Sequence, residues 1–154
     1  MPLCRSDRNS LELAGFALAE GVARASAGLT IEPTLVVWEE GDTRCIPVQS
    51  ELTAKTHASV LLDTLSHSLA AAALLLEKRR RTQRFLHILA WADGSWRFDI
   101  LMRFIPGAPL RVQPERIRGV SPRSERGMAL DAVYSGVGGH PRGLEAWVRA
   151  EVDL

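Results

Sequence analysis

The chain has 154 residues, of which 46% are hydrophobic and 24% charged, and its formal net charge is +1. This length allows one domain with a substantial core, and the near-zero charge excludes a global field that would attract nucleic acid or an anionic membrane. The charge is nevertheless uneven, because residues 1–77 carry 5 basic and 10 acidic side chains whereas residues 78–154 carry 14 and 8. We expect one domain over residues 1–154 with an acidic and a basic half.

The cysteines and the N-terminus indicate a cytoplasmic protein. Cys4 and Cys45 are too far apart for a metal motif or a disulfide framework, which favours a reducing compartment. Residues 1–10 lack the apolar core of a signal peptide, and the apolar stretch 60–76 is too short and too polar for a membrane span. The alanine and arginine bias is typical of a GC-rich, bacterial-like genome. Nothing in the sequence predicts a cofactor, a metal or a membrane.

The first predicted element is a helix that begins at Asn9 or Ser10, after a loose leader of residues 1–8, and ends before Gly28. Glycine and alanine between Gly15 and Gly21 keep much of its surface small. A helix this apolar is expected to be buried on more than one side.

A β-hairpin is predicted next, with strands 34–40 and 43–49 joined by Gly41-Asp42. In that register the opposed pairs are Glu39 with Arg44, Val37 with Ile46, and Leu35 with Val48. Pro47 lacks an N–H group, so its strand is expected at an edge of the sheet.

A second helix is predicted to begin at Ser50 or Thr53 and to continue to about Arg80. Its apolar residues recur at helical spacing from Ala58 to Leu76. Ser59, Asp63 and His67 lie on its other side. We interpret these three as a solvated face, because a catalytic triad needs its histidine between the serine and the acid.

A second hairpin is predicted around Asp93-Gly94 as a two-residue type I′ turn. In that register Trp91 faces Trp96, Leu89 faces Phe98, His87 faces Ile100, and all lie on one face. The alternation favours a folding element, and the tryptophan pair at its tip remains a candidate ligand site.

Beyond Phe104 the pattern weakens, and residues 105–127 are expected to be irregular and rich in proline, glycine and arginine. Residues 110–112, 117–120 and 128–134 are candidate short strands. Residues 136–143 form a glycine-rich stretch before a short final helix marked by Leu144, Trp147, Val148 and Glu151. The fold class that results is α+β: an antiparallel sheet of two β-hairpins and weaker edge strands, covered by two long helices in α-β-β-α-β-β order, with a short C-terminal helix.

Three candidate sites remain. An aromatic pocket would be lined by His87, Trp91, Trp96 and Phe98, although a core histidine is the simpler interpretation of His87. A basic patch consists of Lys78, Arg79, Arg80, Arg81 and Arg84, with Arg97, Arg103, Arg111, Arg116 and Arg118 near it in sequence. It could bind phosphate, nucleic acid or an acidic protein, or serve only as the cationic end of a helix. An anion loop would use the amides of Gly138, Gly139 and His140 together with Arg142.

No catalytic signature is present, so we interpret the chain as a non-enzymatic protein-interaction or adaptor module, with a protein partner or self-association. The alternatives are a ligand-binding or small enzyme domain around His87, and a protein that binds nucleic acid or phosphate through residues 78–84. Salt-sensitive self-association would favour the first interpretation, and co-purifying nucleic acid would favour the last.

Overall fold

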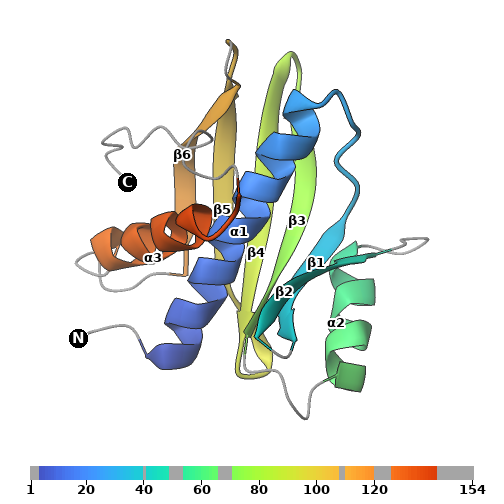
Figure 1. Ribbon diagram of the computed structural model, residues 1–154, viewed down its shortest axis with the longest axis vertical. Helices are drawn as coiled ribbons and strands as arrows, with labels where there is room; N and C mark the ends of the chain where they lie inside the picture. Colours follow the sequence, from blue (N-terminus) through green and yellow to red (C-terminus); the bar gives the residue numbers. More distant parts are fainter. Residues whose placement is uncertain are drawn as a thin grey trace.

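The computed structural model describes residues 4–39, 41–48, 54–65, 71–107, 110–119 and 126–141. These residues form a mixed α+β structure with an antiparallel sheet, as the sequence predicts, and the sheet has six strands (Figure 1). The elements in chain order are α1 (Arg5–Ser26), β1 (Thr34–Glu39), β2 (Asp42–Pro47), α2 (Ala54–Leu65), β3 (Ala71–Arg80), β4 (Gln83–Ala92), β5 (Ser95–Ile105), β6 (Arg111–Arg118) and α3 (Arg126–Gly138).

The strand order is β2-β1-β3-β4-β5-β6, so β2 and β6 are the edges. One face of the sheet packs against α1 and α3, and the β1–β3–β4 part of the other face packs against α2 (Figure 1). Alternate residues of each strand therefore belong to two separate cores. In β3, for example, Ala73 and Leu75 join the α1 core whereas Ala72 and Leu74 join the α2 core.

Helix α1 begins at Arg5, four or five residues earlier than the predicted start at Asn9 or Ser10, so the expected loose leader is wrong for residues 5–8. The reason is a long-range partner, because Asp7 in the first turn is buried and its Oδ2 accepts a hydrogen bond from Arg97 at 3.1 Å. The predicted end is confirmed. Gly28 has a φ of +74°, and Leu29 N–H donates to the Arg24 carbonyl at 2.9 Å, which closes the helix.

The first hairpin has the predicted faces but a different register. Glu39 lies opposite Asp42 and Val37 opposite Arg44, so each predicted partner is shifted by two residues. A shift of two preserves the side-chain alternation. Glu39 and Arg44 still form an ion pair, at 2.5 Å, and the predicted edge position of the Pro47 strand is confirmed.

The second predicted helix is wrong for residues 71–80, which form β3 and not a helix. The continuous apolar run 71–76 has no period that separates a buried helix from a buried strand. It is a central strand, paired with β1 and β4 and packed on both faces, and such strands are apolar throughout. The predicted caps Ser50 and Thr53, together with His67, lie outside the described residues.

The second hairpin turns at Asp93-Gly94 as predicted, with both φ angles positive and Trp91 opposite Trp96. Below the tip a β-bulge shifts the register by one, so that Ala90 faces Phe98 and Leu89 faces Asp99. Arg97 is the extra residue. The predicted pairs Leu89–Phe98 and His87–Ile100 are therefore wrong. Beyond the bulge, the side chains of β5 lie on the face of the sheet opposite to the predicted one.

The C-terminal third is more regular than expected. The two candidate strands at 110–112 and 117–120 are replaced by one edge strand, β6, in which Glu115 is a bulge residue. The predicted strand 128–134 is wrong and belongs to α3, because Ala129, Val133 and Val137 form a fully buried stripe at helical spacing. The predicted final helix lies outside the described residues.

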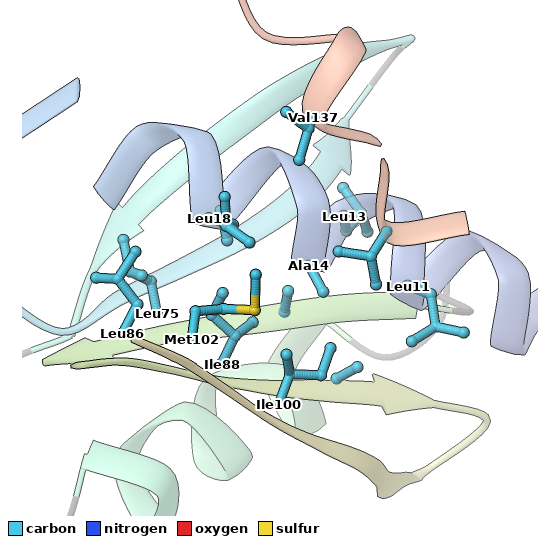
Figure 2. Close-up of a cluster of buried hydrophobic side chains, with 14 of the residues drawn as sticks. Leu11, Leu13, Ala14, Leu18, Leu75, Leu86, Ile88, Ile100, Met102 and Val137 are labelled. Atoms are coloured by element: carbon cyan, nitrogen blue, oxygen red, sulfur yellow. The ribbon is translucent and has the colours of Figure 1, made fainter. Parts of the chain in front are cut away.

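The main core lies between α1 and the sheet (Figure 2). Leu11, Leu18, Leu86, Ile88 and Met102 are fully buried there. Helix α3 crosses α1 at glycines. A Cβ atom on Gly15 would lie 1.8 Å from the Val133 carbonyl oxygen, and one on Gly136 would lie 1.7 Å from the Glu12 carbonyl oxygen. The two helices thus touch backbone to backbone.

Candidate functional site: a basic groove at one end of the sheet

The β3–β4 hairpin, the end of β5 and the start of β6 lie at the same end of the sheet, where α1 also ends (Figure 1). The antiparallel register brings them together, with Arg80 opposite Gln83, Phe85 opposite Arg103, and Ile105 opposite Arg111. The start of α1 and the β4–β5 turn lie at the opposite end, where Ser6 Oγ donates to Asp93 Oδ2 at 2.5 Å.

The predicted basic patch occupies this hairpin and not a helix terminus, so a helix dipole does not account for it. Lys78, Arg79 and Arg80 end β3, Arg81 lies in the turn, and Arg84 is near the start of β4. Arg81 adopts a φ of +56°. The two-residue hairpin loop requires this conformation at its first position, because Arg80 pairs directly with Gln83.

A hollow of about 330 Å³ opens beside this turn. Its lining combines polar, cationic and apolar side chains: Thr82, Gln83, Arg84, Arg103, Phe104, Pro106 and Leu110. A second hollow, lined by Arg80, Arg81, Thr82 and Gln83, shares two residues with the first. We call the two together the basic groove.

The arginines of the basic groove differ in their partners. The Arg84 guanidinium lies 4.9 Å from the centre of the Phe104 ring and pairs with Glu77, which also contacts Arg79 at 3.4 Å. Arg84 is therefore held in place and largely neutralised.

Arg80, Arg81 and Arg103 are less well compensated. Arg80 and Arg81 are exposed and form no ion pair with any of the described residues. The buried Nε of Arg103 has no hydrogen-bond acceptor among those residues, and its nearest carboxylate oxygen, on Glu115, lies at 3.6 Å. An anion in the second hollow would meet the exposed guanidinium groups of Arg80 and Arg81, whose donors have no carboxylate partner among the described residues. Arg103 adds positive charge in the adjoining hollow.

The sequence located the cationic run but missed the apolar side of the basic groove. Phe104 lies near the end of β5, whereas Pro106 and Leu110 lie between β5 and β6, in the segment 105–127 that the sequence predicts to be irregular. The Pro106-Gly107 turn signal after an alternating strand could have marked a second strand returning to the same end of the sheet.

The predicted aromatic pocket does not form as a set of four. Phe98 packs in the α1 core, whereas Trp91 and Trp96 pack with α2 on the opposite face. The bulge at Arg97 is the cause, because one extra residue turns Phe98 to the other side.

The two tryptophans hold α2 against the sheet. Trp91 is 7% exposed, and the indole N–H of Trp96 donates to Ser59 Oγ at 2.9 Å. Ser59 in turn donates to the Lys55 carbonyl at 2.8 Å. The aromatic pair at the hairpin tip is thus already covered, and Ser59 serves packing between α2 and the hairpin.

His87 lies on the same face as Trp91 but farther along β4, and it is part of a polar group. Its Nε2 lies 2.8 Å from Asp99 Oδ1, which also lies 3.7 Å from an Arg116 guanidinium nitrogen. The one-residue shift places Asp99 beside His87, so the histidine has a structural hydrogen-bond partner.

The predicted anion loop has a different local structure. Gly138 ends α3, and the amides of Gly139 and His140 donate to the carbonyls of Gly136 and Val137, each at 3.1 Å. These two N–H groups are therefore engaged within the helix terminus. Arg142, the cation of the predicted loop, lies outside the described residues.

His140 instead joins α3 to α1. Its Nε2 lies 2.9 Å from Glu20 Oε2, and its ring lies 4.9 Å from Phe16. Arg24 donates to Glu20 at 3.1 Å and to Thr34 Oγ1 at 2.8 Å. Burial alone would raise the pKa of Glu20, but the hydrogen bonds and charges of His140 and Arg24 together outweigh it, so the pKa lies below its ordinary value.

The Glu20→Gln variant is expected to lose less stability on acidification than the wild type. A carboxyl group with a lowered pKa in the folded state stabilises the protein above its unfolded pKa, and this stabilisation is lost as the pH falls through the folded value. Urea unfolding between about pH 6 and about pH 3 measures the difference. Identical pH profiles for the two proteins would contradict the proposed role of Glu20.

The described residues contain no cluster of three or more histidine, cysteine or acidic side chains that could hold a metal ion. The pKa of the Cys45 thiol is raised, mainly by burial. The negative charge of Glu20 raises it further, and the smaller effect of Arg24 lowers it. No helix in the described ranges is long and apolar enough to cross a membrane.

Comparisons with known proteins do not assign this chain to a class of protein. No family model matches the chain, and no curated protein or solved structure matches it either. The function must therefore be inferred from the arrangement of the residues.

Proposed function

We propose that this protein is a non-enzymatic interaction module that binds an acidic segment of a partner protein in the basic groove. The observation that carries the proposal is the pairing of two exposed arginines, Arg80 and Arg81, with the accessible apolar side chains Pro106 and Leu110 in adjoining hollows. Charge complementarity would orient the partner, and burial of its apolar residues would add affinity.

The lining favours a peptide over a nucleic acid. Phosphate contacts need cations but no apolar wall, whereas single-stranded nucleic acid is usually held by stacking on exposed aromatic rings. Phe104 is only 9% exposed, and Arg84 covers its ring. A segment that alternates acidic and apolar side chains fits both kinds of surface in the basic groove.

Reversing two charges in the basic groove is expected to weaken binding about tenfold or more. The probe is a fluorescein-labelled peptide of alternating glutamate and leucine, and the measurement is fluorescence anisotropy at low and high salt. The variant is Arg80→Glu with Arg81→Glu, because neither side chain has an ion pair among the described residues. Wild-type binding should weaken as salt screens the charges.

The matched control is Arg5→Glu with Arg8→Glu, which makes the same change in net charge. Both residues are exposed in the first turns of α1, at the opposite end of the sheet. This control should keep the affinity of the wild type. Equal losses in both variants, or equal binding of a peptide with lysine in place of glutamate, would refute the proposal. Tighter binding of a single-stranded oligonucleotide would favour the nucleic-acid alternative.

A further inference from the structure

Strand β2 has an open edge whose hydrogen-bonding groups can be assigned. Val48 N–H donates to the Pro33 carbonyl at 3.0 Å, and Asp42 is the closing partner of Glu39 in the hairpin. Successive residues of a strand direct their N–H and C=O groups to opposite sides. Even-numbered residues of β2 therefore point toward β1, and Thr43, Cys45 and Pro47 point outward.

The backbone groups that point away from β1 form a short site for pairing with another strand. Pro47 is one of these outward residues, so its missing N–H group costs the β1–β2 pairing no hydrogen bond. Thr43 and Cys45 keep both donor and acceptor. No other described strand pairs with this edge of the sheet.

The opposite edge is protected against pairing. Strand β6 contains Pro114, a bulge at Glu115 and the exposed Arg111 and Arg118. Proline, bulges and charges are the means by which natural sheets block association at an edge. Strand β2 also carries charged residues and a proline, but Pro47 is its last residue and no bulge interrupts its register with β1. The first half of β2 therefore remains open to a partner strand.

We propose that β2 pairs antiparallel with β2 of a second copy of this chain, around a two-fold axis at Thr43. This register places Asp42 opposite the partner's Arg44, and the symmetry repeats the contact. These would be non-hydrogen-bonded cross-strand pairs, whose side chains lie closest together. The sheets of the two copies would then be continuous.

Charge selects this register over its neighbours. A shift of the axis to Arg44 would place Arg44 opposite itself, and like charges directly opposite are destabilising. A shift to Cys45 would place Arg44 opposite Ile46 and leave Asp42 without a cation. Only the Thr43 register pairs opposite charges twice.

Both charged residues are available for the contact. Asp42 is exposed and forms no ion pair with the described residues. Arg44 contacts Glu39, but the side chains are 59% and 53% exposed, so this ion pair is weak and Arg44 can contact Asp42 of a second copy as well. Because so short a pairing buries little area, we expect a concentration-dependent dimer.

Charge reversal tests the proposal in the full chain. Sedimentation velocity over a concentration series should show a dimer for the wild type and a monomer for Asp42→Arg, which opposes two pairs of arginines. The double variant Asp42→Arg with Arg44→Asp should dimerise again, because it restores both contacts with the signs exchanged. A wild type that is monomeric at all concentrations, or a double variant that stays monomeric, would overturn the proposal.

Cross-linking tests the register itself. With Cys4→Ser and Cys45→Ser in place, Thr43→Cys should form an intermolecular disulfide when oxidised glutathione accepts the two electrons. Opposed residues of a hydrogen-bonded pair lie about 5.5 Å apart at Cα, within the range of a disulfide. Faster cross-linking of the native Cys45 in a Cys4→Ser protein would contradict the Thr43 axis.

The dimer does not depend on the function proposed for the basic groove, and the two can fail separately. Arg80→Glu with Arg81→Glu should remain dimeric while it loses peptide binding. Asp42→Arg should remain able to bind the peptide as a monomer. Loss of dimerisation in the groove variant would assign self-association to the groove and overturn the proposal for β2.

Discussion

Gly15→Ala is expected to destabilise the protein by about 3 kcal/mol, because it forces α1 and α3 apart. The added methyl would lie 1.8 Å from the Val133 carbonyl oxygen and 2.8 Å from the Val137 amide nitrogen. Both are backbone atoms, so the contact can be relieved only by moving a helix. Separation of the helices would expose the fully buried stripe of α3 that contains Val133 and Val137. Thermal unfolding should shift downward by about 6–12 °C.

Gly21→Ala is the matched control, since it makes the same substitution in the same helix. Its Cβ would meet only side-chain atoms of Leu86 and Leu75, at 2.9 Å and beyond, and these can rotate away. The better helix propensity of alanine, about 1 kcal/mol, should offset most of that adjustment. If Gly15→Ala melts with the wild type, α1 and α3 do not cross as closely as described.

Gly136→Ala should have a similar effect, because its Cβ would meet the Glu12 carbonyl oxygen at 1.7 Å. Once one methyl has separated the helices, the second has less to disrupt. The double variant Gly15→Ala with Gly136→Ala should therefore lose less stability than the two single variants added together. This non-additivity would locate both glycines at one crossing.

The small residues of α1 illustrate what a sequence can and cannot predict. Gly15 and Gly21 predict close packing on more than one side, and that expectation is confirmed. Gly15 approaches α3 and Gly21 approaches the sheet. The identity of each neighbour depends on residues more than fifty positions away, which no local pattern encodes.

The sequence pattern predicts a helix at β3 for a different physical reason. A strand buried on both faces is apolar at every position, so the alternation that identifies a surface strand disappears. Alanine at positions 71–73 favours a helix in isolation, but pairing with β1 and β4 overrides that propensity. Because a helix is predicted there, the sequence also predicts that the basic patch lies at a helix end, whereas it lies at a hairpin.

The four residues of the predicted aromatic pocket do not come together, and one residue is the cause. The two residue pairs next to the turn of the second hairpin have the predicted register. Beyond Trp96, the extra residue Arg97 exchanges the faces on which the side chains of β5 lie. Arg97 contacts Asp7 in the first turn of α1, some ninety residues earlier in the chain. The sequence shows the alternation of the strand but not the ion pair at the bulge.

The candidate groove was predictable in part. The basic run 78–84 is conspicuous in the sequence, and Arg103 was among the cations expected near it. That these arginines adjoin Phe104 and Leu110 follows only from the pairing of β4, β5 and β6. Apolar walls beside cations favour a peptide ligand, so this part of the site required the fold.

Leu18→Ala is expected to cost about 2–5 kcal/mol of unfolding free energy. Leu18 is fully buried where α1 packs on the sheet, in the cluster that also holds Leu86 and Met102 (Figure 2). Its truncation removes apolar contacts and leaves a cavity, because strands β4 and β5 cannot collapse toward the helix without breaking their own pairing. Denaturant unfolding measures the loss, and thermal unfolding should show a fall in melting temperature of about 4–20 °C.

Leu29→Ala makes the same chemical change at a side chain that is 59% exposed, just beyond the end of α1. Its structural role is the backbone hydrogen bond to Arg24, which alanine preserves. The variant should therefore stay within about 0.5 kcal/mol of the wild type. Equal losses at positions 18 and 29 would mean that α1 does not pack on the sheet as described, since leucine truncation would then act without regard to burial. A loss of unfolding free energy at position 18 alone would mean that the fold is stabilised by the core between α1 and the sheet. Strands of this sheet also position the basic groove.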